Sequence, residues 1–343
     1  MNTTKAPQHQ LAQNMKTVAR LAGVSHATVS RVINGTGLVL PATAERVRKA
    51  IDQLGFIPNP SGTTLRYGRS KVFGLILPDL TNPFYPEFLL NFERALVATD
   101  HEVMLATTQV SSPELARSVR RMLMRRVDGV VLMASEFDTR SIEPLLSHRV
   151  PIVTIDRRVT QKGAADVAID FETGYLQAAI HLKKLGHKRI GFIGGSEGLV
   201  TSKVRLKAFQ TALEDVGLNY DEKLTRMGDY RVAGGRSAMQ SLLTLRKRPT
   251  AVMTVNDLTA FGALRALHDA KVDVPDEISV VGCDGILLGD VFPPGLTSIA
   301  VSYDEMSRKC LEALRGVKAN IESKGPLLVV PSTLVVRGST GPA

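Results

Sequence analysis

The sequence predicts an α/β protein, in which a small all-α headpiece precedes a body of two doubly wound parallel-sheet subdomains. Up to residue 58, apolar residues recur only at helical spacing, whereas from residue 72 short β-branched runs alternate with helical stretches. The length of 343 residues is enough for two or three domains. Charged residues make up 22% of the chain, an ordinary globular share that excludes a wholly disordered protein.

The headpiece, residues 15–58, is expected to follow a disordered tail at residues 1–14. Gly23 breaks the first helical pattern, and Ser25 is a favourable N-cap for the second helix. Pro41 suits the first turn of the third helix, because its missing N–H would be unpaired there anyway. The predicted helices cover Lys16–Ala22, Ser25–Asn34 and Pro41–Leu54.

Residues 59–71 are predicted to form a hinge, because this stretch is rich in Pro, Gly, Ser and Thr. The body, residues 72–343, begins with VFGLILP, and similar runs follow: EVMLATT, GVVLMA, PIVTID, VAID, RIGFIGG, AVMTV and ISVVGCD. Strands that alternate with helices indicate βαβ units and a parallel sheet covered on both faces. The charged break at Asp156–Asp166 indicates two successive subdomains.

Polar side chains follow several predicted strands at their carboxyl ends. They are Asp79, Asp156, Asn256, Asp257 and Asp284. Each one alone is more simply explained as a helix N-cap. Because ligands of doubly wound sheets bind beyond the carboxyl ends of the strands, the set together predicts a pocket for a polar small molecule.

The charge of the chain is concentrated in its first fifth. Residues 1–70 carry nine Lys or Arg against two acidic residues, which accounts for +7 of the formal net charge of +10. A basic module predicts a polyanionic partner, although a solvated extension is the alternative. Two cysteines allow no disulfide framework, and neither a membrane-spanning run nor an N-terminal apolar segment is present, so we expect a cytoplasmic, nucleoid-associated protein.

The first two predicted helices form a candidate helix–turn–helix. The second helix is expected to expose His26, Ala27, Ser30 and Arg31, while Val29, Val32 and Ile33 pack inward. A short, basic, exposed helix fits the major groove of DNA. Other small helical bundles have similar patterns, so this motif alone is moderately specific.

Longer segments resemble the lac-repressor (LacI/GalR) family of transcriptional regulators. AGVSHATVSRVING and ERVRKAIDQLGFIPN resemble its DNA-binding headpiece, and GLILPDLTNPFYPEFL, HLKKLGHKRIGFIGG and VPDEISVVGCD resemble its body. The resemblance covers about residues 15–340. It implies a repressor, not an enzyme and without a cofactor, that binds a pseudo-palindromic operator as a homodimer. It also implies a periplasmic-binding-protein-like body, with subdomains at about 72–158 plus 303–319 and about 162–298 plus 327–343.

The family's DNA contacts fall on specific residues of this sequence. The resemblance implies base contacts for His26, Ala27 and Arg31, and phosphate contacts for Ser25, Thr28, Ser30 and Asn34. It places Leu65 where the family inserts a leucine into the minor groove. Two departures, Leu40 and Ala44, remove expected phosphate contacts at the third helix.

The family's effector contacts fall on residues of the predicted pocket. The resemblance implies Asp156, Arg205, Asn256 and Asp284 as polar contacts, Tyr230 as a stacking wall, and Asn82 and Phe84 on the first-subdomain side. Such groups suit a sugar, a sugar acid or a related metabolite. A surface salt bridge is the alternative for Arg205. Whether the ligand releases or tightens DNA is open.

Two competing functions remain. The GGSEG turn around Ser196, with Asp257 and His268 in order, has the form of a hydrolase nucleophile elbow, but His268 falls within a predicted helix. The second alternative is a solute-binding protein without a DNA role. His181 and His187 are expected at the surface, with no zinc-site spacing.

Overall fold

A computed structural model describes residues 14–57, 70–108, 112–133 and 139–343. It divides into two compact units, Met1–Ser70 and Lys71–Ala343, which we describe separately. The predicted tail up to residue 13 and residues 58–69 of the hinge region, Leu65 included, lie outside the described residues. Within the described ranges, no helix is both long enough and apolar enough to cross a membrane.

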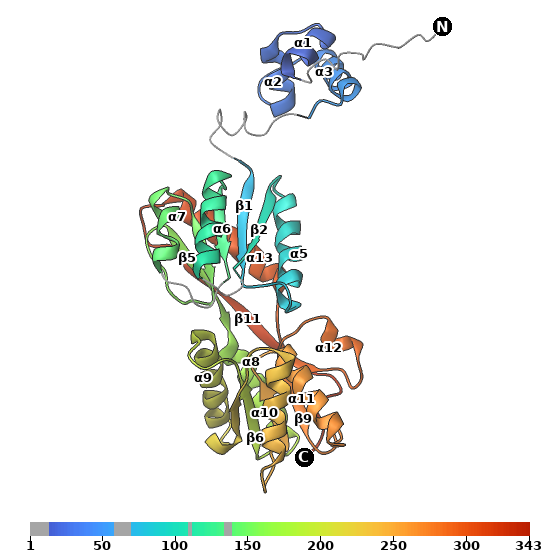
Figure 1. Ribbon diagram of the computed structural model, residues 1–343, viewed down its shortest axis with the longest axis vertical. Helices are drawn as coiled ribbons and strands as arrows, with labels where there is room; N and C mark the ends of the chain where they lie inside the picture. The colour runs from blue at the N-terminus through green and yellow to red at the C-terminus, as the bar shows by residue number, and fades with distance from the viewer. Residues whose placement is uncertain (1–13, 58–69, 109–111, 134–138) are drawn as a thin grey trace, which may run out of the picture. The chain divides into compact units, whose positions relative to one another are not determined.

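The headpiece contains three helices, as predicted (Figure 1). Gly23 ends the first helix in the left-handed conformation with φ of 64°, and the Ser25 hydroxyl accepts a hydrogen bond from the Thr28 N–H at the start of the second. Apolar side chains of all three helices and of Phe56 form a small core. The helices are α1 (Met15–Ala22), α2 (His26–Asn34) and α3 (Pro41–Leu54).

The body is built on eleven strands in the order β2-β1-β3-β4-β5-β11-β10-β9-β8-β6-β7. Neighbouring strands are parallel except for β10 and β11. The strands are β1 (Val72–Leu77), β2 (Glu102–Thr107), β3 (Gly129–Leu132), β4 (Ile152–Ile155), β5 (Ala164–Asp170), β6 (Ile190–Gly194), β7 (Thr225–Met227), β8 (Ala251–Thr254), β9 (Ser279–Asp284), β10 (Thr297–Val301) and β11 (Leu327–Val335).

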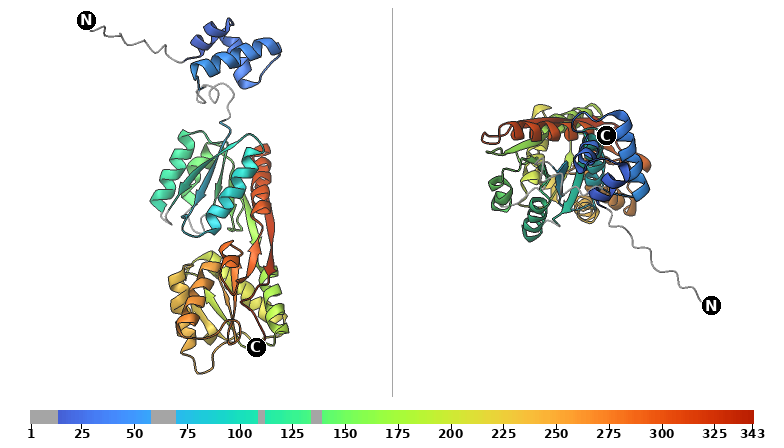
Figure 2. Two further views of the ribbon diagram at one scale, coloured as in Figure 1. Left: turned by 90° about the vertical axis from the view of Figure 1, so that its right-hand side faces the viewer. Right: turned by 90° about the horizontal axis from the view of Figure 1, so that it is seen from above.

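Helices cover both faces of the sheet in each of two lobes (Figures 1 and 2). Neighbouring residues Leu75 and Ile76 of β1 belong to different core clusters, because successive side chains of a strand point to opposite faces. The helices of the first lobe are α5 (Phe84–Val97), α6 (Ser112–Met124), α7 (Glu143–Ser147) and α13 (Tyr303–Ala319). Those of the second lobe are α8 (Phe171–Lys184), α9 (Val200–Asp215), α10 (Val232–Leu243), α11 (Asp257–Asp269) and α12 (Leu288–Val291).

Three segments cross between the lobes: the β5–α8 junction, the β10–α13 junction and β11 itself. One end of β11 pairs with β5 and the other with β10, so a single strand continues through both lobes. Figure 2 shows β11 and α13 side by side along one edge of the body. The lobes are therefore joined by strands that are themselves part of the sheet.

The start of the second subdomain differs from the expectation. We expected it at about residue 162, but β5 pairs with β4 and so belongs to the first lobe. The buried Asp166 carboxylate of β5 accepts hydrogen bonds from the Thr154 hydroxyl of β4 and from the backbone N–H of Arg158, which ties β5 to the preceding loop and strand. The chain enters the second lobe only at Phe171.

Candidate functional site

The exposed face of α2 carries three of the residues expected to contact bases. His26, Ala27 and Arg31 are all exposed, and none of their side chains takes part in the headpiece core. At the N-terminus of the helix, the hydroxyls of Ser25 and Thr28 lie 3.0 Å apart. This face therefore presents one guanidinium, one imidazole and a small apolar side chain at helical spacing.

Ser30 was wrongly expected to be exposed. It is only 7% exposed, because its small side chain lies beside Val29 on the side of α2 that faces the other helices. The Asn34 side-chain nitrogen donates to the Ser30 carbonyl at 2.7 Å and lies 3.2 Å from the Ser30 hydroxyl. The Asn34 side-chain nitrogen is therefore occupied by contacts within α2, while the residue itself is half-buried.

The start of α3 agrees with the departure seen in the sequence. Leu40 occupies the N-cap position and makes no side-chain capping hydrogen bond. Its side chain is exposed, as is Leu38 just before it. The hydroxyl that would otherwise cap this helix is therefore missing.

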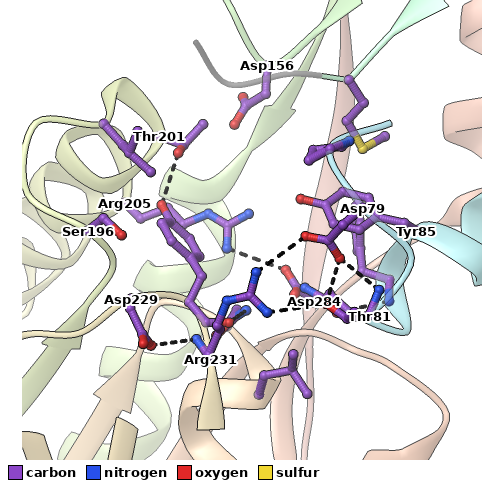
Figure 3. Close-up of a pocket in the computed structure, with 18 of the residues that line it drawn as sticks. Asp79, Thr81, Tyr85, Asp156, Ser196, Thr201, Arg205, Asp229, Arg231 and Asp284 are labelled. Carbon is purple, nitrogen blue, oxygen red and sulfur yellow. Dashed lines mark hydrogen bonds and ion pairs between the residues drawn. The ribbon is translucent and has the colours of Figure 1, made fainter. Parts of the chain in front are cut away.

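A cavity of about 370 Å³ lies between the two lobes of the body (Figure 3). This volume is within the range of small-molecule sites. Its walls come from the loops after β1, β3, β4, β6, β7, β8 and β9, as expected for a site at the carboxyl ends of the strands. The lining includes all seven residues of the predicted effector site: Asn82, Phe84, Asp156, Arg205, Tyr230, Asn256 and Asp284.

Arg205 lies in the wall of this cavity and is buried, so it is not a surface residue. It is 9% exposed, its Nη1 donates to the Val255 carbonyl, and the same atom lies 3.4 Å from Asp284 Oδ1. Its guanidinium carbon lies 4.2 Å from the centroid of the Phe171 ring. The Arg205 Nε is buried without a hydrogen-bond partner among the described residues. One donor of the guanidinium is therefore unsatisfied in the wall of the cavity.

Two buried carboxylates flank Arg205. Burial raises the pKa of Asp156 to about 6 and that of Asp284 to about 7, although the positive charge of Arg205 opposes both shifts. Asp156 accepts a long backbone hydrogen bond from Ile169 at 3.4 Å. Figure 3 shows Asp156 across the cavity from Asp284. These oxygens are acceptors that ligand hydroxyl groups can satisfy.

The backbone is strained at three of the lining residues. The φ values are 59° at Asp156, 64° at Tyr230 and 125° at Asp284. Residues other than glycine rarely adopt such positive values. Such strain persists only where the surrounding structure imposes it, and it clusters at functional sites.

Asn256 supports the wall of the cavity. Its side-chain oxygen accepts hydrogen bonds from the backbone and the hydroxyl of Thr259, and its nitrogen donates to the Tyr230 carbonyl at 3.0 Å. The expected acceptance of a ligand hydroxyl by Asn256 is therefore a minor role at most, because the oxygen already has two donors. The Tyr230 ring packs on Gly195, where any Cβ would lie 2.1 Å from the ring.

Several lining residues were missed by the sequence analysis, including Thr81, Ser196, Thr201, Asp229 and Arg231. Asp229 and Arg231 follow β7, a three-residue strand that the apolar pattern did not reveal. Arg231 reaches the other lobe, where its Nη2 lies 3.7 Å from Asp79 Oδ2. A second contact between the lobes joins the Leu287 N–H to Glu87 Oε1 at 3.0 Å.

The residues of the hydrolase alternative do not form a triad. Ser196 lines the cavity, but Asp257 is buried and accepts hydrogen bonds from the Ser298 hydroxyl and the Ile286 N–H. His268 is exposed on α11 and lines a different groove. The three side chains therefore lie in three different environments: the cavity, the buried interior and an exposed groove.

His187 was also wrongly expected at the surface. It is buried, with Nδ1 2.8 Å from the Thr250 hydroxyl and Nε2 3.0 Å from the Gly341 carbonyl. Burial lowers its pKa, which favours the neutral ring. It therefore anchors the last residues of the chain to the second lobe.

Known proteins resemble the chain over nearly its whole length. A family model for bacterial regulatory proteins of the lacI family matches residues 14–59, and one for a periplasmic-binding-protein-like domain matches 179–340. The transcriptional regulator DegA of Bacillus subtilis is 31% identical over 95% of this chain and 97% of its own. The ribose operon repressor of Escherichia coli is 33% identical over 88% and 91%.

Solved structures agree in fold. A lac repressor dimer bound to operator and the anti-inducer ONPF superimposes with a TM-score of 0.83 at 25% identity, covering 96% of this chain and 99% of that one. A complex of the transcriptional regulator CelR with cellobiose gives 0.71 at 32% identity, with 95% and 99% covered. A solute-binding protein without a DNA role is therefore excluded. The chain belongs to the LacI family and is a helix–turn–helix DNA-binding transcriptional repressor with a periplasmic-binding-protein-like effector domain.

Proposed function

We propose that this repressor binds a pseudo-palindromic operator as a homodimer, and that a sugar or sugar acid in the cavity between the lobes controls this binding. The observation that carries the proposal is the position of Arg205, which lines the cavity and is buried between two carboxylates. Carboxylates accept from ligand hydroxyls, while a guanidinium donates to ring and hydroxyl oxygens.

The position of the cavity explains how a ligand would act. Asn82 and Phe84 come from the first lobe, whereas Arg205, Tyr230 and Asp284 come from the second. A ligand that touches both sets binds best at one spacing of the lobes. It therefore shifts the population of lobe arrangements by its difference in affinity for them.

The headpiece supports the DNA half of the proposal. Arg31, exposed on α2, can pair with guanine in the major groove, and Ala27 can touch a thymine methyl group. The relatives supply a parallel for each half, since one is a dimer on its operator and another is bound to cellobiose. We infer the sugar class from the cavity and not the particular sugar.

An exposed apolar surface on the second lobe supports the homodimer. Leu287 is 74% exposed and Phe292 is 65% exposed, and Val291 lies between them. A groove lined by Phe261 and Leu296 adjoins them. Exposed clusters of large apolar side chains on soluble proteins mark association surfaces.

The test combines ligand screening with DNA binding. The purified protein is screened by thermal shift against sugars, sugar acids, sugar phosphates and nucleosides. Each hit is then tested for its effect on operator affinity by fluorescence anisotropy, with an operator selected from random-sequence DNA. At 100 times its Kd, a ligand adds about 2.7 kcal/mol to the stability of the state that binds it, which gives a clear shift.

Arg205→Ala should abolish the ligand response and leave operator binding in place. Arg236→Ala is the matched control, because Arg236 is a partly exposed arginine of the second lobe, paired with Asp269 away from the cavity. Asp156→Asn provides a milder change in the same site if Arg205→Ala folds poorly. A ligand response retained in both cavity variants would contradict the proposed site.

A further inference from the structure

The cavity is unusually rich in carboxylates for a site that has two guanidinium groups. Among the described residues that line it, the acidic ones are Asp79, Asp156, Asp229 and Asp284, and the basic ones are Arg205 and Arg231. Each arginine is already paired across a short distance with one of these carboxylates, Arg205 with Asp284 and Arg231 with Asp79.

The inner pair, Arg205 and Asp284, leaves no unpaired positive charge for a ligand. Arg205 lies among Asp156, Asp284 and the Tyr230 ring, and one guanidinium faces two carboxylates. Asp284 also accepts a hydrogen bond from the Asn82 side chain. The raised pKa values of both acids reflect the cost of holding this much negative charge in a buried place. A further anion here would meet like charge in a medium that screens it poorly.

The outer pair, Arg231 and Asp79, lies at the mouth of the cavity, and hydrogen bonds hold the Asp79 carboxylate in place. The backbone N–H and the hydroxyl of Thr81 both donate to Asp79 Oδ1 at 2.7 Å. Burial favours a higher pKa for Asp79, but these hydrogen bonds and the charge of Arg231 outweigh it and lower the pKa, so the carboxylate is ionised.

Arg231 is fixed at its base and extends across the mouth. Its backbone N–H donates to Asp229 Oδ1 at 2.9 Å, and its Nη1 lies 3.4 Å from the Thr81 hydroxyl. Figure 3 shows the side chain extending from Asp229 to Asp79. At 58% exposure its guanidinium is the cation that an incoming ligand reaches first.

We propose that Asp79 neutralises Arg231 and thereby makes the cavity select uncharged sugars over the corresponding sugar acids and phosphates. The inference rests on the proposed function and narrows its ligand class. Selectivity of this kind comes from the repulsive element as much as from the attractive one. Neutral hydroxyl groups can donate to the four carboxylates, whereas a ligand carboxylate finds both guanidinium groups occupied.

The unpartnered Arg205 Nε does not change this conclusion, because the atom is buried and offers no exposed donor to a ligand carboxylate. A ligand carboxylate beside this guanidinium would lie close to Asp156 and Asp284, the two acids whose ionisation burial already opposes. A ligand hydroxyl or ring oxygen at the same place carries no charge.

The test compares matched neutral and anionic sugars on the full chain. Isothermal titration calorimetry at pH 7.5 measures Kd for glucose with glucuronate, galactose with galacturonate, and mannose with mannuronate. The wild type should bind a neutral sugar at least tenfold tighter than its acid. In Asp79→Asn, Arg231 loses its acidic partner and is free to bind a ligand carboxylate. The affinity for the acid relative to that for the neutral sugar, called here the acid-to-neutral ratio, should therefore rise about fivefold, as expected for loss of one partly exposed ion pair.

Two further variants make the test specific. The double variant Asp79→Asn/Arg231→Gln should lose the gain, because the gain depends on the freed guanidinium. Asp304→Asn is the matched control, since Asp304 is an exposed acid of the first lobe, paired with Arg308. Its acid-to-neutral ratio should equal that of the wild type.

The outcomes separate the two proposals. Wild-type protein that binds an acid as tightly as its neutral parent overturns the charge selection and leaves the proposed function standing. A gain that survives in the double variant, or appears in Asp304→Asn, overturns the role of the Asp79–Arg231 pair. If neither these six compounds nor any sugar or sugar acid of the thermal-shift screen binds, both proposals are overturned.

Discussion

The guanidinium of Arg205 stacks on Phe171, with 4.2 Å between the guanidinium carbon and the ring centroid. Phe171 is the first residue of α8 and directly follows β5, so it lies where the chain passes from the first lobe to the second. The central residue of the effector cavity therefore packs on the junction between the lobes.

The same junction is tied to another crossing segment. The Ser332 hydroxyl of β11 donates to the Asp170 carbonyl, and the Asp170 side chain caps α8 through the Thr173 N–H. A ligand that shifts Arg205 acts on a place where two of the three crossings are joined. This arrangement gives a physical route from the cavity to the spacing of the lobes.

Replacing Arg205 by lysine should weaken sugar binding at least tenfold. Lysine keeps the charge but loses the planar stack on Phe171 and the fork of donors that faces Asp284 and the cavity. Loss of one charge-assisted hydrogen bond alone costs about 1.5–3 kcal/mol. Calorimetry with the best sugar from the screen measures the change, and wild-type affinity in Arg205→Lys would show that the fork is not used.

Strand-end polarity predicted which residues line the cavity between the lobes, whereas their contacts with an effector stay a prediction. Asp156, Asn256 and Asp284 all follow buried apolar strands, and all line the cavity. The rule works because parallel strands bring their carboxyl ends to one edge. It missed Arg231 because β7 has three half-buried residues and no apolar run. It also could not show that Asn256 is used to hold Tyr230, since that depends on the three-dimensional partner.

Periodicity was less informative about burial on short helices. Ser30 and Asn34 bond to each other along α2, a contact between residues four apart that no hydropathy pattern distinguishes from outward exposure. His187 is polar and lies in a turn, yet its partners Thr250 and Gly341 come from distant parts of the chain. Long-range hydrogen bonds of this kind leave no mark in the local sequence.

Gly174→Ala should destabilise the body by about 1–3 kcal/mol. A Cβ at this position would lie 2.3 Å from both Ile299 Cγ2 and Ser332 Oγ, where α8 meets the strands that cross between the lobes. Gly316→Ala is the matched control on α13, where the nearest atom would be 3.8 Å away in Pro326. The control should gain up to about 1 kcal/mol from helix propensity. Chemical denaturation measures both, and equal stabilities would contradict the packing described here.

Arg31→Ala and Ser30→Ala should differ in their effect on DNA. Arg31 is exposed and suited to guanine, so its loss should cost about 1–3 kcal/mol at one base pair and relax specificity there. Ser30 is buried, so Ser30→Ala should leave the sequence preference unchanged. Anisotropy titrations on the selected operator and its single-base variants measure both. A preference altered equally by the two changes would contradict the assigned face of α2.

Asp156→Asn should become more stable relative to the wild type as the pH rises. The pKa of Asp156 is raised by burial to about 6, whereas in the unfolded chain it is about 4. The folded state therefore holds a proton that the unfolded chain has lost, and the stability from this group disappears as pH rises from about 4 through 6. The difference between variant and wild type should change by about 3 kcal/mol at most.

Thermal denaturation between pH 4.5 and pH 8 measures that difference. Comparing the two proteins at each pH cancels the opposite contribution of His187, whose lowered pKa makes acid destabilising. A flat difference for Asp156→Asn would show that the carboxylate is not buried in solution.

Phe292→Ser should weaken the homodimer. The side chain is 65% exposed in the single chain and adjoins Leu287 and Val291, so a second copy would bury it. Burying a phenylalanine side chain contributes about 1.5–3 kcal/mol, and a symmetric dimer loses two such side chains, which corresponds to a dimer Kd raised about a hundredfold or more. Val159→Ser is the control, because Val159 is similarly exposed but lies in the loop before β5, away from this surface.

Sedimentation equilibrium measures the dimer Kd. Two headpieces must read the two halves of the operator together. At low protein concentration the operator affinity of Phe292→Ser should therefore fall along with the fraction of dimer. An unchanged dimer would place the association surface elsewhere on the body.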